Sequence, residues 1–508
     1  MTTQIDQQVS RLFGRDSVYM LLWAAQLLCA AGFTPVITRL LGTGEMGVVA
    51  SSIAIMQVLF VFAGSFLATA VQREYERAGG RVNAARILTV AMLIAALVAL
   101  PAAATIGWWA RPLGLAGEGV ALRLAVAWAA GSAVTAVSLA LLRSQDRLLR
   151  FALVSLTQSV LAEAASLAII AGDRRTGADF LYGRVLAQGA ALLLAVLLTR
   201  PRAVRLRDLP MVRDAMGFAL PLVPAVLGTF VLSTADRLIV QGLMGNDAVA
   251  RYQVAYNIAS APMLLLAMLY SMWMPRFFAV SGQAERAAVI AAGRDVLYRL
   301  MVPLIGGLTI GAPIILRLWA PPSYRMDELA WTVLIVVVTA VPFSSQLAAS
   351  QALTTQGRTV GIAVATLVAA LANVLLNLVL VPRYGLTGSA VATLASYGLL
   401  AAFLGHRARL PAAPWLSPVR LGGATFVAVL ATAAPTTGWA FWIRALLVVL
   451  SVAWFLFILA GLREAPRPPT RRWSRRSSSS EIPRARRAAP RHSAAAAEAG
   501  RTARHTLP

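Results

Sequence analysis

The stretch Ser233-Thr-Ala-Asp-Arg-Leu-Ile-Val-Gln-Gly-Leu-Met-Gly-Asn-Asp-Ala-Val-Ala-Arg-Tyr-Gln-Val-Ala-Tyr256 lies near the middle of the chain and organises the rest. It begins inside an apolar segment, carries Asp236 and Arg237, breaks at a Gly-Asn-Asp turn and enters a second apolar segment. Adjacent charges are expensive in hydrocarbon, and inside a membrane helix they indicate a functional site by default. The stretch therefore predicts a charged pair within a membrane helix, followed by a short turn and another helix.

The turn in this stretch has a counterpart 203 positions earlier in the chain. Leu41-Gly-Thr-Gly-Glu-Met-Gly47 follows the same order as Met244-Gly-Asn-Asp-Ala-Val-Ala250, and each lies between two long apolar runs. This weak repeat predicts a protein built of two similar halves.

The composition is that of a membrane protein. Hydrophobic residues make up 58% of the 508 residues and charged residues 13%, about half of what a soluble domain carries. The net charge of +25 would suggest nucleic acid as a partner of a soluble protein. Here the arginines lie in loops between apolar segments, which favours a topology signal and no nucleic-acid partner.

Windows of about 20 apolar residues, the length that spans a bilayer, give the fold class. The sequence predicts an all-α polytopic membrane protein with about 14 transmembrane helices, at 17–41, 47–70, 85–108, 119–142, 150–171, 179–199, 215–244, 249–273, 296–318, 329–352, 359–381, 386–405, 419–436 and 439–462. The seventh of these holds 30 residues, roughly 45 Å of helix against about 30 Å of hydrocarbon. We expect it to tilt, bend or extend beyond the membrane, and Pro221 and Pro224 offer a place to bend.

The arginines test this count independently. With the N-terminus inside, the inside segments carry 21 arginines and the outside segments nine. A bias of this size over short loops predicts that both termini are cytoplasmic.

The chain is expected to divide into six regions. They are a cytoplasmic N-terminus at 1–16, a six-helix bundle at 17–199, a cytoplasmic linker at 200–214, a pseudo-symmetric six-helix bundle at 215–405, an additional helix pair at 419–462, and a disordered Arg-rich cytoplasmic tail at 463–508. The tail is too polar to bury enough surface to fold, and its arginines could adhere to anionic lipid.

Catalytic chemistry is not expected. The only histidines are His406 in an inside loop and two in the tail, and Cys29 is the single cysteine. The sequence contains no metal-ligand set, no phosphate-binding glycine loop and no helical His-Glu-x-x-His, so we expect neither an enzyme nor a cofactor or metal.

What remains is a small set of polar residues within the helices. Counting 1.5 Å per residue places Glu163 about 12 Å and Arg184 about 7.5 Å below the outer surface, which permits an ion pair between neighbouring helices. Asp236 lies at about 12 Å, but it and Arg237 are adjacent, and adjacent helix residues do not face one another. The remaining candidates at similar depth are Tyr252, Tyr256, Asn373 and Asn377. Either these are isolated pairs that hold helices together, or they line a water-filled cavity between two halves.

Three motifs resemble one known family. Thr38-Arg-Leu-Leu-Gly42 with Glu45-Met-Gly47 resembles the N-terminal signature of polysaccharide biosynthesis proteins, the oligosaccharide-lipid flippases of the multidrug/oligosaccharidyl-lipid/polysaccharide exporter superfamily. Asp236-Arg237 with Gly245, Tyr252 and Ala255 resembles their segment from the seventh to the eighth helix. Asn373-Val-Leu-Leu-Asn377 with Pro382, Gly385 and Gly388 resembles their eleventh-helix motif.

The resemblance covers about residues 10 to 405 and implies two six-helix bundles around a central cavity that opens alternately to each side. It implies a flippase of the bacterial plasma membrane that exports a polyprenyl-pyrophosphate-linked oligosaccharide for cell-surface polysaccharide synthesis. Its partners would be this glycan, membrane lipid, and possibly a glycan polymerase and glycosyltransferases. A count of fourteen helices is similar to that of the lipid II flippase branch. Whether the substrate is lipid II or another glycolipid stays open.

Arginine can bind phosphate bidentately, so Arg39, Arg184 and Arg237 are candidates for the pyrophosphate, with Asp236, Tyr252, Tyr256, Asn373 and Asn377 as further binding residues. Glu163 or Asp236 could couple transport to an ion. The alternatives are a cation-coupled multidrug antiporter of the same superfamily and a non-transporting membrane scaffold whose working part is the tail.

Overall fold

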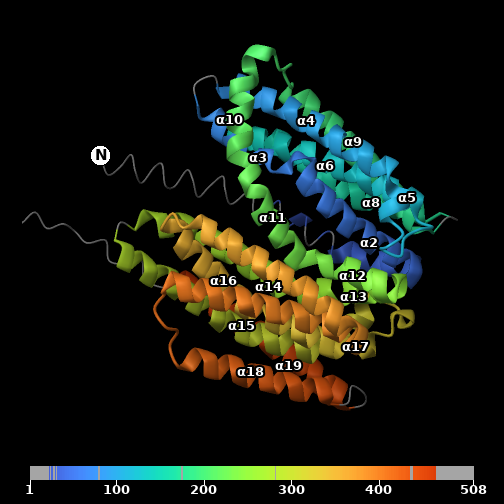
Figure 1. Ribbon diagram of the computed structural model, residues 1–508. Coiled ribbons are helices and arrows are strands. Elements are labelled where there is room, and N and C mark those ends of the chain that lie inside the picture. The colour runs from blue at the N-terminus through green and yellow to red at the C-terminus, as the bar shows by residue number, and fades with distance from the viewer. Residues whose placement is uncertain are drawn as a thin grey trace, which may run out of the picture. The chain divides into compact units, whose positions relative to one another are not determined.

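The computed structural model describes residues 22, 25, 26, 29, 31–77, 80–172, 175–280, 282–434 and 439–464. The regular structure in these ranges is helical throughout, and none of their residues lies in a strand (Figure 1). Apolar helices of this length satisfy every backbone N–H and C=O internally, as a chain in hydrocarbon must.

The long helices, numbered from α2, are α2 (Thr43–Phe60), α3 (Leu67–Tyr75), α4 (Gly80–Ala104), α6 (Gly119–Ser144), α7 (Leu148–Leu156), α8 (Ala162–Ile170), α9 (Gly177–Thr199), α10 (Leu209–Ala219), α11 (Val223–Phe230), α12 (Asp236–Met244), α13 (Asn246–Ala259), α14 (Ala261–Ala279), α15 (Gln283–Trp319), α16 (Ala330–Thr355), α17 (Thr359–Ala408), α18 (Leu416–Ala433) and α19 (Trp439–Glu464). Short elements are α5 (Ile106–Trp109), 3₁₀ turns at Leu206–Asp208, Leu220–Leu222, Pro322–Tyr324 and Met326–Leu329, and π-helical turns at Val61–Ser65, Thr157–Leu161 and Val231–Ala235.

The protein is a multi-pass membrane protein. Within the described ranges, eleven helices are long and apolar enough to cross a bilayer, or twelve if α13 and α14, bent by 41°, form one span. Thirteen of the fourteen predicted segments coincide with helices. The predicted segment at 17–41 is described only in part, so fourteen spans stay a prediction.

The helix α17 joins two predicted segments, 359–381 and 386–405. Its 50 residues would extend roughly 75 Å, more than twice the hydrocarbon thickness. Gly385 interrupts it with φ 57° and ψ −139°, backbone angles that glycine adopts without steric cost. The two predicted helices therefore exist on either side of this break.

The helices pack in two groups that α10, α11 and α12 connect. The first group contains α2, α3, α4, α6, α8 and α9, and the second contains α13, α14, α15, α16, α17 and α18. The helix α10 contacts α3 and α4, whereas α12 contacts α13 and α17, so the chain crosses from one group to the other between them (Figure 1). The six-region division of the sequence stays a prediction. One of its boundaries differs, because α10 begins at Leu209, inside the predicted linker.

The seventh predicted segment changes helix type at its prolines. A 3₁₀ turn occupies Leu220–Leu222, where Pro221 removes a backbone donor, and Pro224 follows in the first turn of α11. A π-helical turn at Val231–Ala235 then leads directly to Asp236. Such turns insert one extra residue into a helix and often occur at functional sites.

The last two helices are attached to α15 by a buried arginine. Arg444 donates to the carbonyl of Ile310, at 3.1 Å, and to the carbonyls of Ala431 and Ala434 at the end of α18. The final carbonyls of a helix have no partner within it, so Arg444 caps α18 while holding α19 against α15. The predicted disordered tail lies outside the described residues, except that α19 extends to Glu464.

Candidate functional site

The two repeat-like turns each start a helix, and these helix starts contact one another. The helices α2 and α13 begin at Thr43 and Asn246, just after Gly42 and Gly245. A Cβ on Gly47 would lie 2.1 Å from the carbonyl oxygen of Asn246, so the two backbones touch at a point where only glycine fits. The sequence predicts that this end of the helices faces outward, and we call it the predicted outer end.

Further polar contacts join the two groups here. Ser51 donates to Gln241, at 2.9 Å, and Gln241 donates to Asn246, at 2.6 Å. Thr38 and Arg39 donate to the carbonyls of Trp319 and Leu318 at the end of α15, each at 2.8 Å. The predicted outer end is therefore closed by hydrogen bonds between the two groups.

A tyrosine reinforces the same closure from the loop after α15. The Tyr324 hydroxyl lies 3.5 Å from the carbonyl oxygen of Leu41. Burial, with a smaller effect from Asp247, raises the pKa of Tyr324 above its usual value, so the phenol remains a donor.

Asp236 and Arg237 form the centre of a buried polar cluster between α12 and α13. The Tyr252 hydroxyl donates to Asp236 Oδ2 at 2.7 Å, and Arg237 donates to Asp236 Oδ1 at 3.1 Å. Arg237 also donates to Gln253 at 2.5 Å and lies 4.4 Å from the centre of the Tyr256 ring. Every residue of this cluster comes from the stretch Ser233–Tyr256.

Asp236 and Arg237 pair with each other, although adjacent residues on a helix do not face one another. The guanidinium folds back along its own helix, where it also donates to the Ser233 carbonyl at 2.6 Å. The preceding π-helical turn changes the orientation of the helix at this point, and the long Arg side chain covers the remaining distance.

The expected water-filled cavity is also absent from this conformation at these residues. Asp236 is 1% exposed and Arg237 5%, and Tyr252, Asn373 and Asn377 are fully buried. These candidates are therefore enclosed by protein and do not line open space in this conformation. Binding a substrate here would require α12 and α13 to separate.

Asn373 and Asn377 lie on one face of α17, as the spacing predicts. Asn377 Nδ2 donates to the Asn373 carbonyl at 2.9 Å and to Asn373 Oδ1 at 3.2 Å. The Nδ2 of Asn373 and the Oδ1 of Asn377 are buried without a partner. Buried polar groups are normally bonded, so these two atoms have unused capacity for a ligand or for another conformation.

The predicted ion pair between Glu163 and Arg184 is confirmed. Glu163 of α8 accepts from Arg184 of α9, and the guanidinium lies 5.1 Å from the rings of both Trp128 and Phe180. The second carboxylate oxygen of Glu163 and the Nε of Arg184 are buried without partners, as is the hydroxyl of nearby Ser166. This site lies wholly within the first group and is incompletely satisfied.

Arg39 has a different position from the other candidates. Its guanidinium donates to the Pro35 and Leu318 carbonyls, at 2.7 Å and 2.8 Å, and its side chain is exposed. In this conformation Arg39 therefore fastens the predicted outer end, and a phosphate would have to displace two carbonyls.

Two groups of residues escaped the sequence analysis. Gln253, buried beside Arg237, follows Tyr252 directly, and a search for all polar residues along that helix face would have found it. The second group is Arg73, Arg77 and Asp214. The two arginines were counted only among the inside arginines, and Asp214, far from them in sequence, was not singled out.

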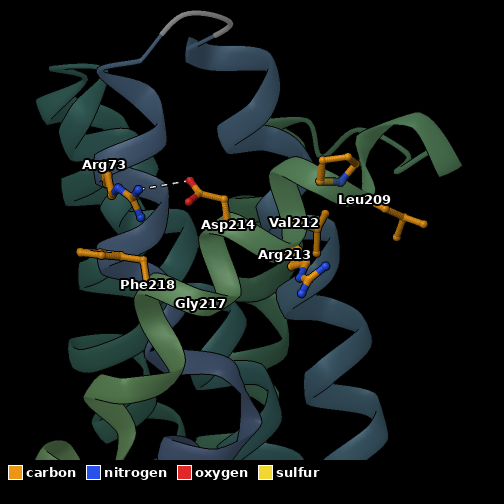
Figure 2. Close-up of a pocket in the computed structure, with 8 residues that line it drawn as sticks. Arg73, Leu209, Val212, Arg213, Asp214, Gly217 and Phe218 are labelled. Carbon is orange, nitrogen blue, oxygen red and sulfur yellow. Dashed lines mark hydrogen bonds and ion pairs between the residues drawn. The ribbon is translucent and has the colours of Figure 1, made fainter.

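Two of these residues, Arg73 and Asp214, line a cavity of about 1010 Å³ beside α10. Figure 2 shows Arg73 reaching toward Asp214, with Phe218 below it and Arg213 on the opposite side of α10. The cavity is lined by Arg73, Leu209, Pro210, Val212, Arg213, Asp214, Gly217 and Phe218. It lies at the end of the helices that the arginine bias predicts to be cytoplasmic, which we call the predicted inner end.

Comparison with known structures defines the class of protein. The chain shares its fold with a lipid II flippase, MurJ, in an inward closed conformation, at TM-score 0.69 and 12% identity over 88% of this chain and 99% of that one. It is also similar to an inward-facing multidrug resistance MATE family transporter of the MOP superfamily, at TM-score 0.61 and 15% identity over 79% and 96% of the two chains. A eukaryotic MATE transporter matches at TM-score 0.54 and 13% identity, over 82% and 99%. The protein is therefore a multi-pass membrane protein with the MurJ and MATE fold.

The family follows from the sequence itself. Residues 36–320 match the family described as polysaccharide biosynthesis protein. The chain belongs to this family, as its three motifs predicted. No curated protein matches it.

Proposed function

We propose that the protein is a flippase that moves a polyprenyl-pyrophosphate-linked oligosaccharide from the inner to the outer leaflet of a bacterial plasma membrane. The family, whose description is polysaccharide biosynthesis, supports a glycan substrate, and a fold shared with a flippase and exporters supports transport. Both termini would be cytoplasmic, and glycosyltransferases and a glycan polymerase would act before and after it.

The observation that carries this proposal is the contact between Gly47 and the Asn246 backbone. Two similar helix starts, one from each group, meet there with no side chain between them, and only a few hydrogen bonds surround the contact. Because no side chain interlocks at this point, the two helix starts can approach and separate. Alternating access needs a closure of this kind on each side.

We assign roles to the site residues according to how many of their buried polar atoms already form hydrogen bonds. Glu163 and Arg184 have unused hydrogen-bonding capacity and are candidates to bind pyrophosphate or sugar within the first group, with Glu163 as a candidate for ion coupling. Asp236, Arg237, Tyr252 and Tyr256, with Asn373 and Asn377, would become binding groups only when α12 and α13 separate. Asp236 is the second candidate for ion coupling, and Arg39 would be released when the predicted outer end opens.

The test is a flipping assay in vesicles of purified protein with a fluorescent polyprenyl-diphosphate oligosaccharide, scored by loss of access to an externally added glycosidase. We expect protein-dependent transfer of the glycan across the bilayer. Vesicles that transfer a cationic drug in exchange for protons or sodium, and leave the glycan in place, would favour a multidrug antiporter instead.

A matched pair of glycine variants tests the mechanism. Gly47→Val should insert normally but abolish flipping, because its side chain overlaps Asn246 and keeps the predicted outer end from closing. Gly44→Ala is the control, since its Cβ would meet only Asp247 at 3.9 Å, an ordinary contact. Equal flipping by both variants would contradict alternating access through this contact.

A scaffold would depend on the Arg-rich tail and not on this contact. Deleting residues 463–508 should leave flipping largely intact. If the deletion abolishes glycan export in cells while Gly47→Val does not, the protein acts as a scaffold.

A further inference from the structure

The predicted inner end carries a three-residue fork that the function described above does not use. Asp214 of α10 accepts hydrogen bonds from Arg73, at 3.1 Å, and from Arg77, at 2.5 Å. Arg73 also lies 4.4 Å from the centre of the Phe218 ring. Two guanidinium groups, from Arg73 in α3 and from Arg77 just after it, thus hold the Asp214 carboxylate of α10, as Figure 2 shows for Arg73. Arg77 also pairs with Glu74, at 2.9 Å.

The fork is exposed to solvent, so little free energy holds it closed. The side chains of Arg73, Arg77 and Asp214 are 25%, 47% and 53% exposed. Ion pairs at exposed positions contribute little to stability, because water and salt screen them and two side chains must be held in place. An anion with more charge than a carboxylate can therefore compete for the two arginines.

The adjacent cavity has the chemistry of an amphiphile site. Its volume of about 1010 Å³ lies at the upper end of the range for pockets that take small molecules. Beyond the fork its lining is apolar except for Arg213, and Leu209 and Phe218 are 52% and 40% exposed. Two guanidinium groups match a phosphate anion in geometry and charge, and exposed apolar side chains match a hydrocarbon chain attached to it.

We propose that Arg73 and Arg77 form a loading site for the diphosphate of a prenyl diphosphate, and that Asp214 occupies this site as an internal competitor until the ligand displaces it. The proposal rests on the proposed function, because it assigns an entry site to the same substrate. Its consequence is that loading detaches α10 from α3. The 3₁₀ turn at Leu220–Leu222 lies just beyond and permits α10 to move without carrying α12 along.

Binding to purified protein in a neutral detergent tests the site, with farnesyl diphosphate as the titrant and calorimetry as the measurement. Arg73→Gln with Arg77→Gln should weaken binding about tenfold or more, since charged hydrogen bonds are lost. Asp214→Asn should tighten it about two- to fivefold, because the competitor is removed. Arg81→Gln is the matched control, since it removes one arginine from the same predicted inner surface but not one that pairs with Asp214, and it should change nothing.

The sign of the Asp214→Asn effect separates a competitor from a structural residue. A residue that merely holds α10 in place would leave affinity unchanged or weaken it when replaced. Unchanged or weaker binding by Asp214→Asn would therefore overturn the proposal, as would equal binding by the double arginine variant and the wild type.

Other ligands identify the source of the phosphate. Farnesol should not bind, and inorganic diphosphate should bind more weakly than farnesyl diphosphate because it lacks the chain. If inorganic diphosphate binds equally well, or if vesicles of phosphatidylglycerol compete with farnesyl diphosphate at equal phosphate concentration, the site takes anions or lipid headgroups in general and the assignment fails.

The flipping assay keeps this inference apart from the proposed function. Suppose that the wild type flips the glycan lipid, but the fork variants bind farnesyl diphosphate with the same affinity as the wild type. Then only the assignment of the loading site fails. If the fork binds as expected but the wild type flips nothing, the loading site stands and the proposed function fails.

Discussion

Each half of the molecule contains one acid–arginine pair, Glu163 with Arg184 and Asp236 with Arg237. The pairs differ in how many of their polar atoms form hydrogen bonds. Glu163 follows a π-helical turn at Thr157–Leu161, and Asp236 follows one at Val231–Ala235. The first pair joins two helices through one carboxylate oxygen and leaves the other oxygen buried without a partner. The second lies on one helix, and both oxygens of Asp236 are bonded.

The difference shows that charge alone does not identify a binding site in a membrane helix. The pair that stands out in the sequence, Asp236 with Arg237, is the better satisfied of the two and functions as a fixed junction of α12 and α13 in this conformation. Glu163 with Arg184 has unused donors and acceptors, and a buried polar group without a partner is costly until something bonds it. The incompletely satisfied pair is therefore the better prepared for a ligand.

The largest effect is expected from breaking the fixed junction. Arg237→Ala leaves Asp236 buried without its charge partner, which costs about 3–5 kcal/mol of folding free energy. The measurement is equilibrium unfolding of the purified protein in a denaturing detergent, together with its level in the membrane. Arg237→Lys should recover only part of the loss. An ammonium group keeps the charge but lacks the planar guanidinium fork that bonds Asp236, Gln253 and Ser233 at once.

The control for this prediction removes both charges. Asp236→Asn with Arg237→Gln should cost less than Arg237→Ala alone, since no unpaired charge remains. A stability of Arg237→Ala equal to that of the wild type would show that the junction is not fixed, and the comparison between the two pairs would then fail.

Breaking the second pair should cost somewhat less. Arg184→Ala leaves Glu163 alone within the membrane, at about 2.5–3.5 kcal/mol on insertion scales. Glu163→Gln with Arg184→Gln should recover part of this stability but not the flipping, because the neutral pair cannot bind diphosphate. If the two single losses simply add in the double variant, the residues do not interact and each is free to bind substrate separately.

A single hydroxyl sharpens the comparison further. Tyr252→Phe removes the donor to Asp236 Oδ2 and leaves a buried acceptor unbonded, at about 1–3 kcal/mol. The thermal unfolding midpoint reports this loss. Tyr256→Phe is the matched control: it removes the neighbouring hydroxyl but keeps the ring near Arg237, so a loss as large as that of Tyr252→Phe would argue against the assigned bond.

The smallest effect concerns the aromatic neighbours of the two arginines. Trp128→Leu removes a ring whose centre lies 5.1 Å from the Arg184 guanidinium carbon, and Tyr256→Leu removes one 4.4 Å from that of Arg237. Each cation–π contact contributes about 0.5–2 kcal/mol. We expect Trp128→Leu to alter diphosphate affinity as well as stability, since Arg184 is the available cation. Tyr256→Leu should alter stability alone, and an effect on affinity from this variant would show that Arg237 is accessible after all.

The positions of the helices were predictable from the sequence because apolar length is a direct requirement of the bilayer. The segment at 119–142, rich in small residues, nevertheless gave a weak signal. Its helix α6 has 72% of its most apolar window buried among other helices, where small side chains permit close packing, whereas only 6% of the window in α19 is buried.

The candidate site was less predictable. Helical depth correctly paired Glu163 with Arg184, because both lie on regular helices on either side of a short loop. The self-pairing of Arg237 depends on a π-helical turn, and the fork at Asp214 joins residues 137 and 141 positions apart. Neither a local change of helix type nor a contact between distant segments leaves a periodic signal in a single sequence.

The contacts of Arg444 have a consequence for the order in which the chain is made. The Ile310 carbonyl that it bonds precedes it by 134 residues, and ribosomes add about 5–20 residues per second. For a time on the order of ten seconds, α15 and then α18 are in the membrane without this cap. We infer that the second half completes its packing only when the last helix arrives, which makes the newborn chain dependent on its neighbours in the membrane during that interval.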